Sequence, residues 1–188
     1  MTLLIIGIVI WVAVHFMKRL ALAFRQSLTD RFGDGSKGII ALLLVISVVL
    51  MVIGYRSAEI IAVYDPFSWA GRLNNLLMIV AFVMFGAGSK GSWLASRMRH
   101  PMLVGFKIWA IAHLLVNGDL ASIILFGSML AWAVAQVILI NRATSWAPDR
   151  SIKPGAKDAK LIFAWLVMFA IVAAIHIWLG YNPFVGDF

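Results

Sequence analysis

The sequence predicts an all-α, polytopic membrane protein, a helix bundle of about six transmembrane helices with both termini outside. Of the 188 residues, 63% are hydrophobic and only 13% are charged, and the mean hydropathy is +0.97. A soluble domain does not carry so much apolar surface with so few charges. The apolar runs are continuous over roughly 15–22 residues, which favours spanning helices over the alternating strands of a barrel.

Turn-forming residues separate the expected spans. A loop over residues 24–37 contains Gly33 and Gly35, and Asp65-Pro66 interrupts the second connection. Asn117-Gly118-Asp119 is a tight turn whose aspartate is placed to cap the next helix. The spans are expected at residues 2–23, 38–55, 73–88, 101–117, 119–140 and 160–180, all within a single transmembrane domain over 1–188.

Basic residues predict the orientation of these helices. Apolar sequence begins directly after Met1-Thr2, and its positive charges come after it, so we expect an uncleaved first helix whose N-terminus is outside. Only Arg56 and Arg72 lie in the connections on the opposite side, which makes the lysine and arginine bias a strong positive-inside signal. The basic residues expected on the inner side are Lys18, Arg19, Arg25, Arg31, Lys37, Lys90, Arg97, Arg99, Arg142, Arg150, Lys153, Lys157 and Lys160.

Composition also excludes several classes of function. The chain has no cysteine, which removes disulfides, thiolate metal sites and iron–sulfur clusters. Its net charge of +8 is accounted for by the inner loops of a membrane protein, so we expect the lipid bilayer as a partner and no nucleic acid.

Histidines are the candidate ligands inside the spans. His15, His113 and His176 fall within predicted helices, whereas no aspartate or glutamate lies deep in any span. Ionisable groups in a membrane are costly and mark functional sites. The lack of buried carboxylates argues against a proton pump and against a non-haem metal site. Imidazoles in an apolar bundle suit non-covalently bound haem b, for which all three are candidate iron ligands.

Two of these histidines share a local pattern. Trp11 precedes His15 by four residues and Trp109 precedes His113 by four, so each pair shares a helix face. A flat indole beside an axial ligand suits a porphyrin, although simple packing explains such a pair equally well. A haem parallel to the membrane would take His15 and His113, whereas an upright haem would take His113 and His176. The sequence leaves this choice open.

The residues around His113 complete the candidate cofactor site. Lys107 lies about one and a half turns into its helix, where it pairs with a haem propionate or an anionic substrate, or extends to the inner surface. Arg99 and His100 stand at the inner rim and contact either a cofactor or lipid phosphates. Gly105 precedes His113 by about two turns and leaves a bare patch that a flat ring can approach. Asn74, Asn75 and Gln136 are expected to form hydrogen bonds between helices.

The run from Met98-Arg99-His100-Pro101 to Gly105, followed by residues 109–122, resembles the signature of the NnrU family. The resemblance covers nearly the whole chain and includes the first helix with His15, Lys37-Gly38, Phe126-Gly127 and Ala131-Trp132. It implies a multi-pass protein of the bacterial inner membrane that is linked to nitrite and nitric oxide reduction. Electron transfer, haem sensing and assembly are all compatible with it, and a redox partner is expected.

The same family includes 15-cis-zeta-carotene isomerase, a haem b enzyme, so the alternative is a haem-dependent cis–trans isomerase of an apolar polyene. The resemblance places that enzyme's two haem ligands at His15 and His113. A cysteine that serves the isomerase as an alternative ligand corresponds to Ala110 here, so its redox switch is missing. Whether this chain is an enzyme is left open.

Overall fold

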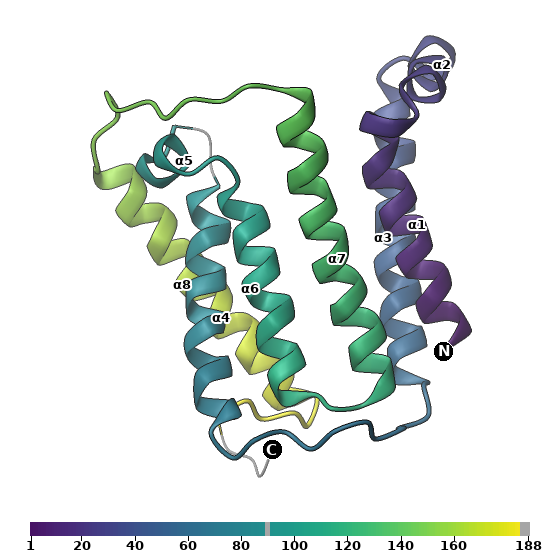
Figure 1. Cartoon of the computed structure of the whole chain (residues 1–188), viewed down its shortest axis with the longest axis vertical. Coiled ribbons are helices and arrows are strands. Elements are labelled where there is room, and N and C mark those ends of the chain that lie inside the picture. The colour runs from purple at the N-terminus through teal and green to yellow at the C-terminus, as the bar shows by residue number, and fades with distance from the viewer. Residues whose placement is uncertain (89–90, 185–188) are drawn as a thin grey trace. The chain divides into compact units, whose positions relative to one another are not determined.

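The computed structural model describes residues 1–88 and 91–184, and within these ranges every regular element is an α-helix (Figure 1). This confirms the predicted all-α, polytopic fold. The helices are α1 (Thr2–Leu20), α2 (Leu22–Phe32), α3 (Gly35–Arg56), α4 (Ala70–Ala87), α5 (Trp93–Arg97), α6 (Pro101–Val116), α7 (Leu120–Ala143) and α8 (Ala156–Trp178).

Five of the described helices are long and apolar enough to cross a membrane, namely α1, α3, α4, α7 and α8. The sixth predicted span corresponds to α6, which is apolar but only 16 residues long. Each predicted span therefore coincides with a helix. The main differences are at helix starts, because α4 begins at Ala70 and α8 at Ala156.

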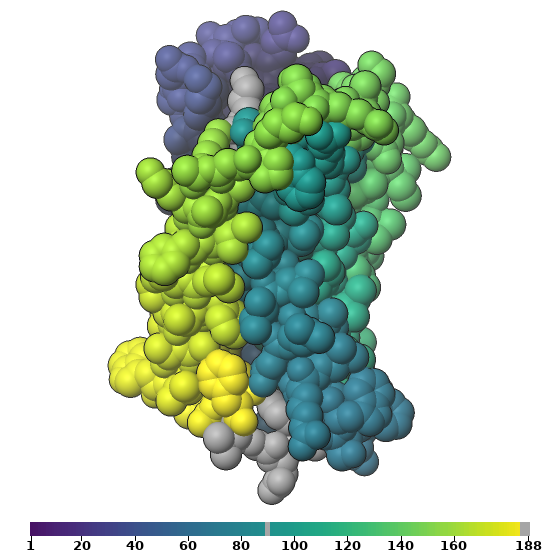
Figure 2. All heavy atoms as spheres, turned by 90° about the vertical axis from the view of Figure 1, so that its left-hand side faces the viewer, coloured from purple at the N-terminus to yellow at the C-terminus, as the bar shows by residue number. Residues whose placement is uncertain are grey.

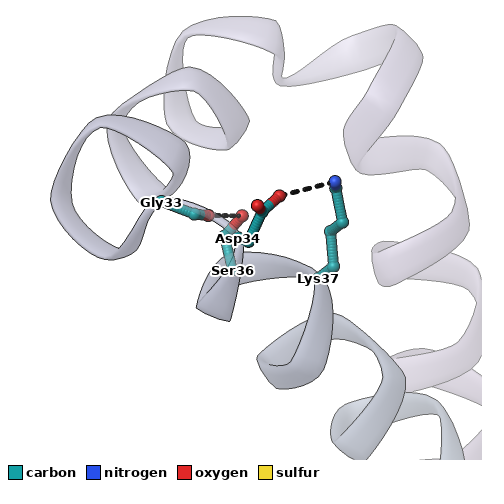
Figure 3. Close-up of polar contacts among 4 residues, drawn as sticks. All are labelled: Gly33, Asp34, Ser36 and Lys37. Carbon is teal, nitrogen blue, oxygen red and sulfur yellow. Dashed lines mark hydrogen bonds and ion pairs between the residues drawn. The ribbon is translucent and has the colours of Figure 1, made fainter.

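The loop that we predicted over residues 24–37 is wrong for most of its length. Helix α2 occupies residues 22–32 and has no buried residue. The sequence of α2 lacks the long apolar run of a membrane span, and for this reason the whole segment was expected to be a loop. The turn itself lies at Gly33, whose φ of 53° favours glycine. Beyond it, the Ser36 hydroxyl donates to the Gly33 carbonyl at 2.7 Å and Lys37 pairs with Asp34 (Figure 3).

The described chain forms two compact units. The first comprises residues 1–63 and 119–128, and in it α1 packs closely on α3. Small residues allow this approach: a Cβ atom on Gly54 would lie 2.1 Å from the Leu4 nitrogen, and one on Gly7 would lie 2.7 Å from the Ser47 carbonyl oxygen. Tyr55 of α3 bonds at 2.8 Å to Ser122 of α7, and Asp119 caps α7 by accepting the Ser122 amide at 2.9 Å.

The second unit comprises residues 64–118 and the described chain from residue 129 onward. In it α4 packs against both α6 and α8, and Figure 2 shows α8 lying along α4. The core between them contains Met78, Phe82 and Ala112, with Trp165 and Phe169 of α8 packed against it. Much of the rest of α8 is exposed and apolar, as expected for a helix that faces lipid acyl chains.

Candidate functional site

A small cavity in the second unit brings two of the three candidate histidines together. Its volume is about 50 Å³, and helices α4, α6 and α8 all contribute to its wall. The polar lining consists of His113, His176, Asn74 and Asn75. The remaining lining residues are Met78, Phe82, Phe169, Val172, Ala173 and Pro183.

The backbone determines which nitrogen of His176 carries the proton. Its Nδ1 lies 2.8 Å from the carbonyl oxygen of Val172, one turn earlier in α8. A carbonyl only accepts, so Nδ1 is the protonated nitrogen and Nε2 carries the lone pair of the neutral ring. His15 in α1 repeats this arrangement, with Nδ1 2.8 Å from the Trp11 carbonyl oxygen. In both residues, the second nitrogen has the chemistry that a metal ligand requires.

His113 is held differently, by the asparagine that ends its helix. The Asn117 Nδ2 donates at 2.8 Å to the His113 carbonyl oxygen, which identifies this atom as nitrogen. The same Nδ2 lies 3.3 Å from His113 Nδ1, so that ring nitrogen accepts. The neutral ring then carries its proton on Nε2, the opposite tautomer from His176.

The predicted tryptophan–histidine pairs are confirmed as neighbours on one helix face. The ring centroids are 4.2 Å apart for Trp11 and His15, and 5.3 Å apart for Trp109 and His113. His15 belongs to the first unit, whereas His113 and His176 belong to the second. The pairing of His15 with His113 therefore stays a prediction, while the proximity of His113 and His176 is a feature of the second unit.

The bare patch that we predicted beside Gly105 is filled by α4. A Cβ atom at this position would lie 2.8 Å from the Ala81 carbonyl oxygen and 2.9 Å from Met84 Cβ. Gly105 thus allows α6 to approach α4, so the space that its missing side chain leaves is occupied by α4, and a role of Gly105 in binding a cofactor stays a prediction. Ala110, on the same helix, is also fully buried.

The inner-rim pair connects helices in the second unit. Arg99 donates to the Thr144 hydroxyl at 3.0 Å and to the Thr144 carbonyl, at the C-terminus of α7. His100 Nε2 lies 2.8 Å from Asn141 Oδ1, also on α7. These contacts tie the start of α6 to the end of α7. Lys107 lies half-buried on α6, so both of its predicted roles stay predictions.

The donor set fits haem b, but the cavity does not hold a porphyrin. Neutral imidazoles are usual axial ligands of haem iron, and His176 and His15 already present the required tautomer. A volume of about 50 Å³ accommodates a molecule of a few heavy atoms, whereas a porphyrin is many times larger. Within the described residues, no three histidine, cysteine or acidic side chains gather as a metal site.

The sequence predicted only interhelical hydrogen bonds for Asn74 and Asn75, and did not place them in the candidate site. Asn74 is buried and Asn75 half-buried near the start of α4, and both line the same cavity as the two histidines. Two adjacent asparagines in an apolar span are the sequence feature that could have indicated their part in the site. The position of α8 beside α4 was required to recognise them as part of a site.

Comparison with protein families shows a match to the NnrU protein family over residues 3–183. Comparisons with curated proteins and with solved structures found no match. The matched range includes every candidate histidine, the inner-rim pair and both asparagines of the cavity. The chain is a multi-pass helical membrane protein, and it belongs to the NnrU family.

Proposed function

We propose that this protein binds haem b non-covalently in the bacterial inner membrane and supports nitrite and nitric oxide reduction. The proposal is supported by the membership of the NnrU family and by three histidines on apolar helices, of which His113 and His176 lie close together in the second unit. The small cavity beside these two histidines would have to widen to admit a porphyrin. Imidazole is the haem ligand that a cysteine-free membrane bundle can supply from several helices. A redox partner is the expected protein partner.

His113 is the principal ligand in this proposal, and either His15 or His176 is the second. His15 and His176 have Nδ1–H donated to a backbone carbonyl, the arrangement that orients an imidazole toward a metal. For His113 to bind iron through Nε2, its ring would need the other tautomer, and the Asn117 carboxamide would have to give up its hydrogen bond to the His113 carbonyl oxygen. Trp11 and Trp109 stand beside His15 and His113 as walls for an aromatic ring.

Reduced-minus-oxidised absorption spectra of the full chain, purified in detergent, test the proposal. We expect a Soret band and a shift of its maximum on reduction. His113→Ala should remove most of the bound haem, whereas His100→Ala should remove much less, because His100 bonds to Asn141 at the rim. A chain that shows no Soret band after haem is supplied would overturn the proposal.

Two further variants identify the second ligand. Loss of haem in His15→Ala with retention in His176→Ala assigns the pair His15 and His113. The reverse pattern assigns His113 and His176, the pair that shares the cavity. If His113→Ala and His100→Ala retained haem equally, α6 would not be the helix that supplies the iron ligand.

The alternative, a carotenoid isomerase, gains no support from the geometry. Ala110 stands where the resemblance places a ligand cysteine, so the isomerase's redox switch is missing. Zeta-carotene isomers incubated with the reduced protein should therefore keep their ratio on chromatography.

A further inference from the structure

Helix α2 connects the two long helices of the first unit, and none of its residues is buried. Figure 1 shows α2 nearly end-on beside the ends of α1 and α3, so it runs across these helices rather than along them. Helix α1 has 19 residues, which extend about 29 Å at 1.5 Å per residue, close to the roughly 30 Å of a hydrocarbon core. When α1 spans the core, α2 therefore lies at the level of the lipid headgroups.

One face of α2 is apolar. Phe24, Leu28 and Phe32 recur every four residues, so their side chains follow one face of the helix, which we call the apolar stripe. Gln26 and Asp30 lie on the opposite face. Within the stripe, Phe24 is 56% exposed and Phe32 is 47% exposed.

The exposure of the apolar stripe raises the question of what stabilises α2. A helix of 11 residues is marginal in water, and most helices in proteins are stabilised by packing of an apolar face. The rest of the chain leaves much of this stripe uncovered. Contact with lipid at the headgroup level would supply the missing apolar environment.

Positive charge surrounds the apolar stripe. Arg25 follows Phe24 and Arg31 precedes Phe32, and the guanidinium carbon of Arg31 lies 5.5 Å from the centre of the Phe32 ring. The arginines therefore flank the stripe on its two sides. Arginine binds phosphate oxygens through two parallel hydrogen bonds, which suits it to a phospholipid headgroup.

The whole connection between α1 and α3 is cationic. Its acidic residues are Asp30 and Asp34, and Asp34 pairs with Lys37. Within the described part of the chain, no other basic residue of this connection forms an ion pair. The basic residues that keep an unpaired charge are Lys18, Arg19, Arg25 and Arg31.

We infer that α2 is an interfacial helix that binds acidic phospholipids. Its apolar stripe enters the boundary between headgroups and acyl chains, and Arg25 and Arg31 contact the headgroup phosphates. Each arginine near an anionic membrane surface increases binding about fivefold. A second copy of the chain is a poorer occupant of the stripe, because it would bring the same positive charges against these. The inference concerns α2 alone and does not depend on the haem proposal.

Fluorescence quenching of the full chain in vesicles tests the orientation of α2. The chain has no cysteine, so Leu28→Cys attaches one small fluorophore to the apolar stripe, and Gln26→Cys attaches it to the opposite face. The vesicles contain equal amounts of phosphatidylcholine and phosphatidylglycerol, with a nitroxide on the acyl chains of one lipid or of the other. We expect nitroxide lipids to quench the fluorophore of Leu28→Cys strongly and that of Gln26→Cys weakly.

The same vesicles test the preference for acidic lipid. In Leu28→Cys, nitroxide phosphatidylglycerol should quench more than nitroxide phosphatidylcholine. Adding Arg25→Gln and Arg31→Gln should lower the local ratio of the two lipids, obtained from the quenching, about fivefold for each arginine. Arg25→Lys with Arg31→Lys is the matched control, which keeps both charges and should keep most of the preference. Circular dichroism checks that each variant retains its helices.

Three results would overturn the inference. Equal quenching of the fluorophores in Leu28→Cys and Gln26→Cys would show that the apolar stripe does not face lipid. Equal quenching by the two nitroxide lipids would show that acidic headgroups are not the partner. Quenching in Leu28→Cys that appears only when the protein is diluted in lipid would indicate that a second copy covers the stripe.

Discussion

Gly54 of α3 lies directly against the backbone of Leu4 in α1. A Cβ atom there would approach the Leu4 nitrogen to 2.1 Å, and its neighbours are backbone atoms that cannot rotate away. Gly54→Ala should therefore destabilise the α1–α3 pair by about 1–3 kcal/mol, the usual cost of overpacking. Thermal unfolding in detergent, followed by circular dichroism, measures the effect.

Gly38 provides the control on the same helix. A Cβ atom at Gly38 meets no atom within 4 Å, so Gly38→Ala should raise stability slightly, by about 0.5–1 kcal/mol, because alanine is the better helix former. If both substitutions changed the unfolding temperature equally, close packing at Gly54 would not be the cause.

The candidate site shows how far single residues could be interpreted from sequence. Histidines within spans and their tryptophan neighbours were recognised because helical spacing alone places them on one face. The juxtaposition of His113 with His176 and Asn74 depends on how α8 packs along α4, which no local pattern encodes. Gly105 was misinterpreted for the same reason, since only the partner helix distinguishes a bare patch from a packed one.

At the scale of elements, Asp119 begins α7 as the sequence predicted. Its carboxylate accepts the amide of Ser122, three residues later, at 2.9 Å, which is the geometry of an N-cap. Asp119→Ala should cost about 0.5–2 kcal/mol of stability. Chemical denaturation of the detergent-solubilised chain measures this difference.

Asp34→Ala is the comparison for this prediction. Asp34 pairs with Lys37 at 2.6 Å (Figure 3), but both side chains are largely exposed, at 92% and 76%. An exposed ion pair contributes little, so its removal should leave the denaturation midpoint nearly unchanged. A larger loss from Asp34→Ala than from Asp119→Ala would contradict the assignment of the cap.

Helices were predictable from sequence where long apolar runs dominate. All six predicted spans are helical because such runs satisfy their backbone hydrogen bonds only within a helix in lipid. Helix α2 was missed because it is short and polar, and α5 because it has only five residues. Helix α5 is held by contacts that a local pattern does not reveal: Ser92 caps it, and Asp158 at the start of α8 accepts the Trp93 amide at 2.6 Å.

For the whole molecule, the distribution of basic residues predicts which side each connection faces. The chain has no cysteine, so single cysteines can be introduced without further changes. Ser68→Cys, before α4, should react with a membrane-impermeant maleimide added outside intact cells. Ser151→Cys, between α7 and α8, should react only after the membrane is opened. The opposite pattern would reverse the predicted orientation.

Helix α6 also has a consequence for the surrounding lipid. Its 16 residues extend about 24 Å at 1.5 Å per residue, less than the roughly 30 Å of a typical hydrocarbon core. Tilting would shorten its reach further, so the bilayer must thin beside it. The headgroup region would then descend toward Asn117 and bring water close to the histidines. We expect the unfolding temperature in vesicles of short-chain phosphatidylcholine to exceed that in long-chain vesicles, since a thicker bilayer would have to thin further around this one helix.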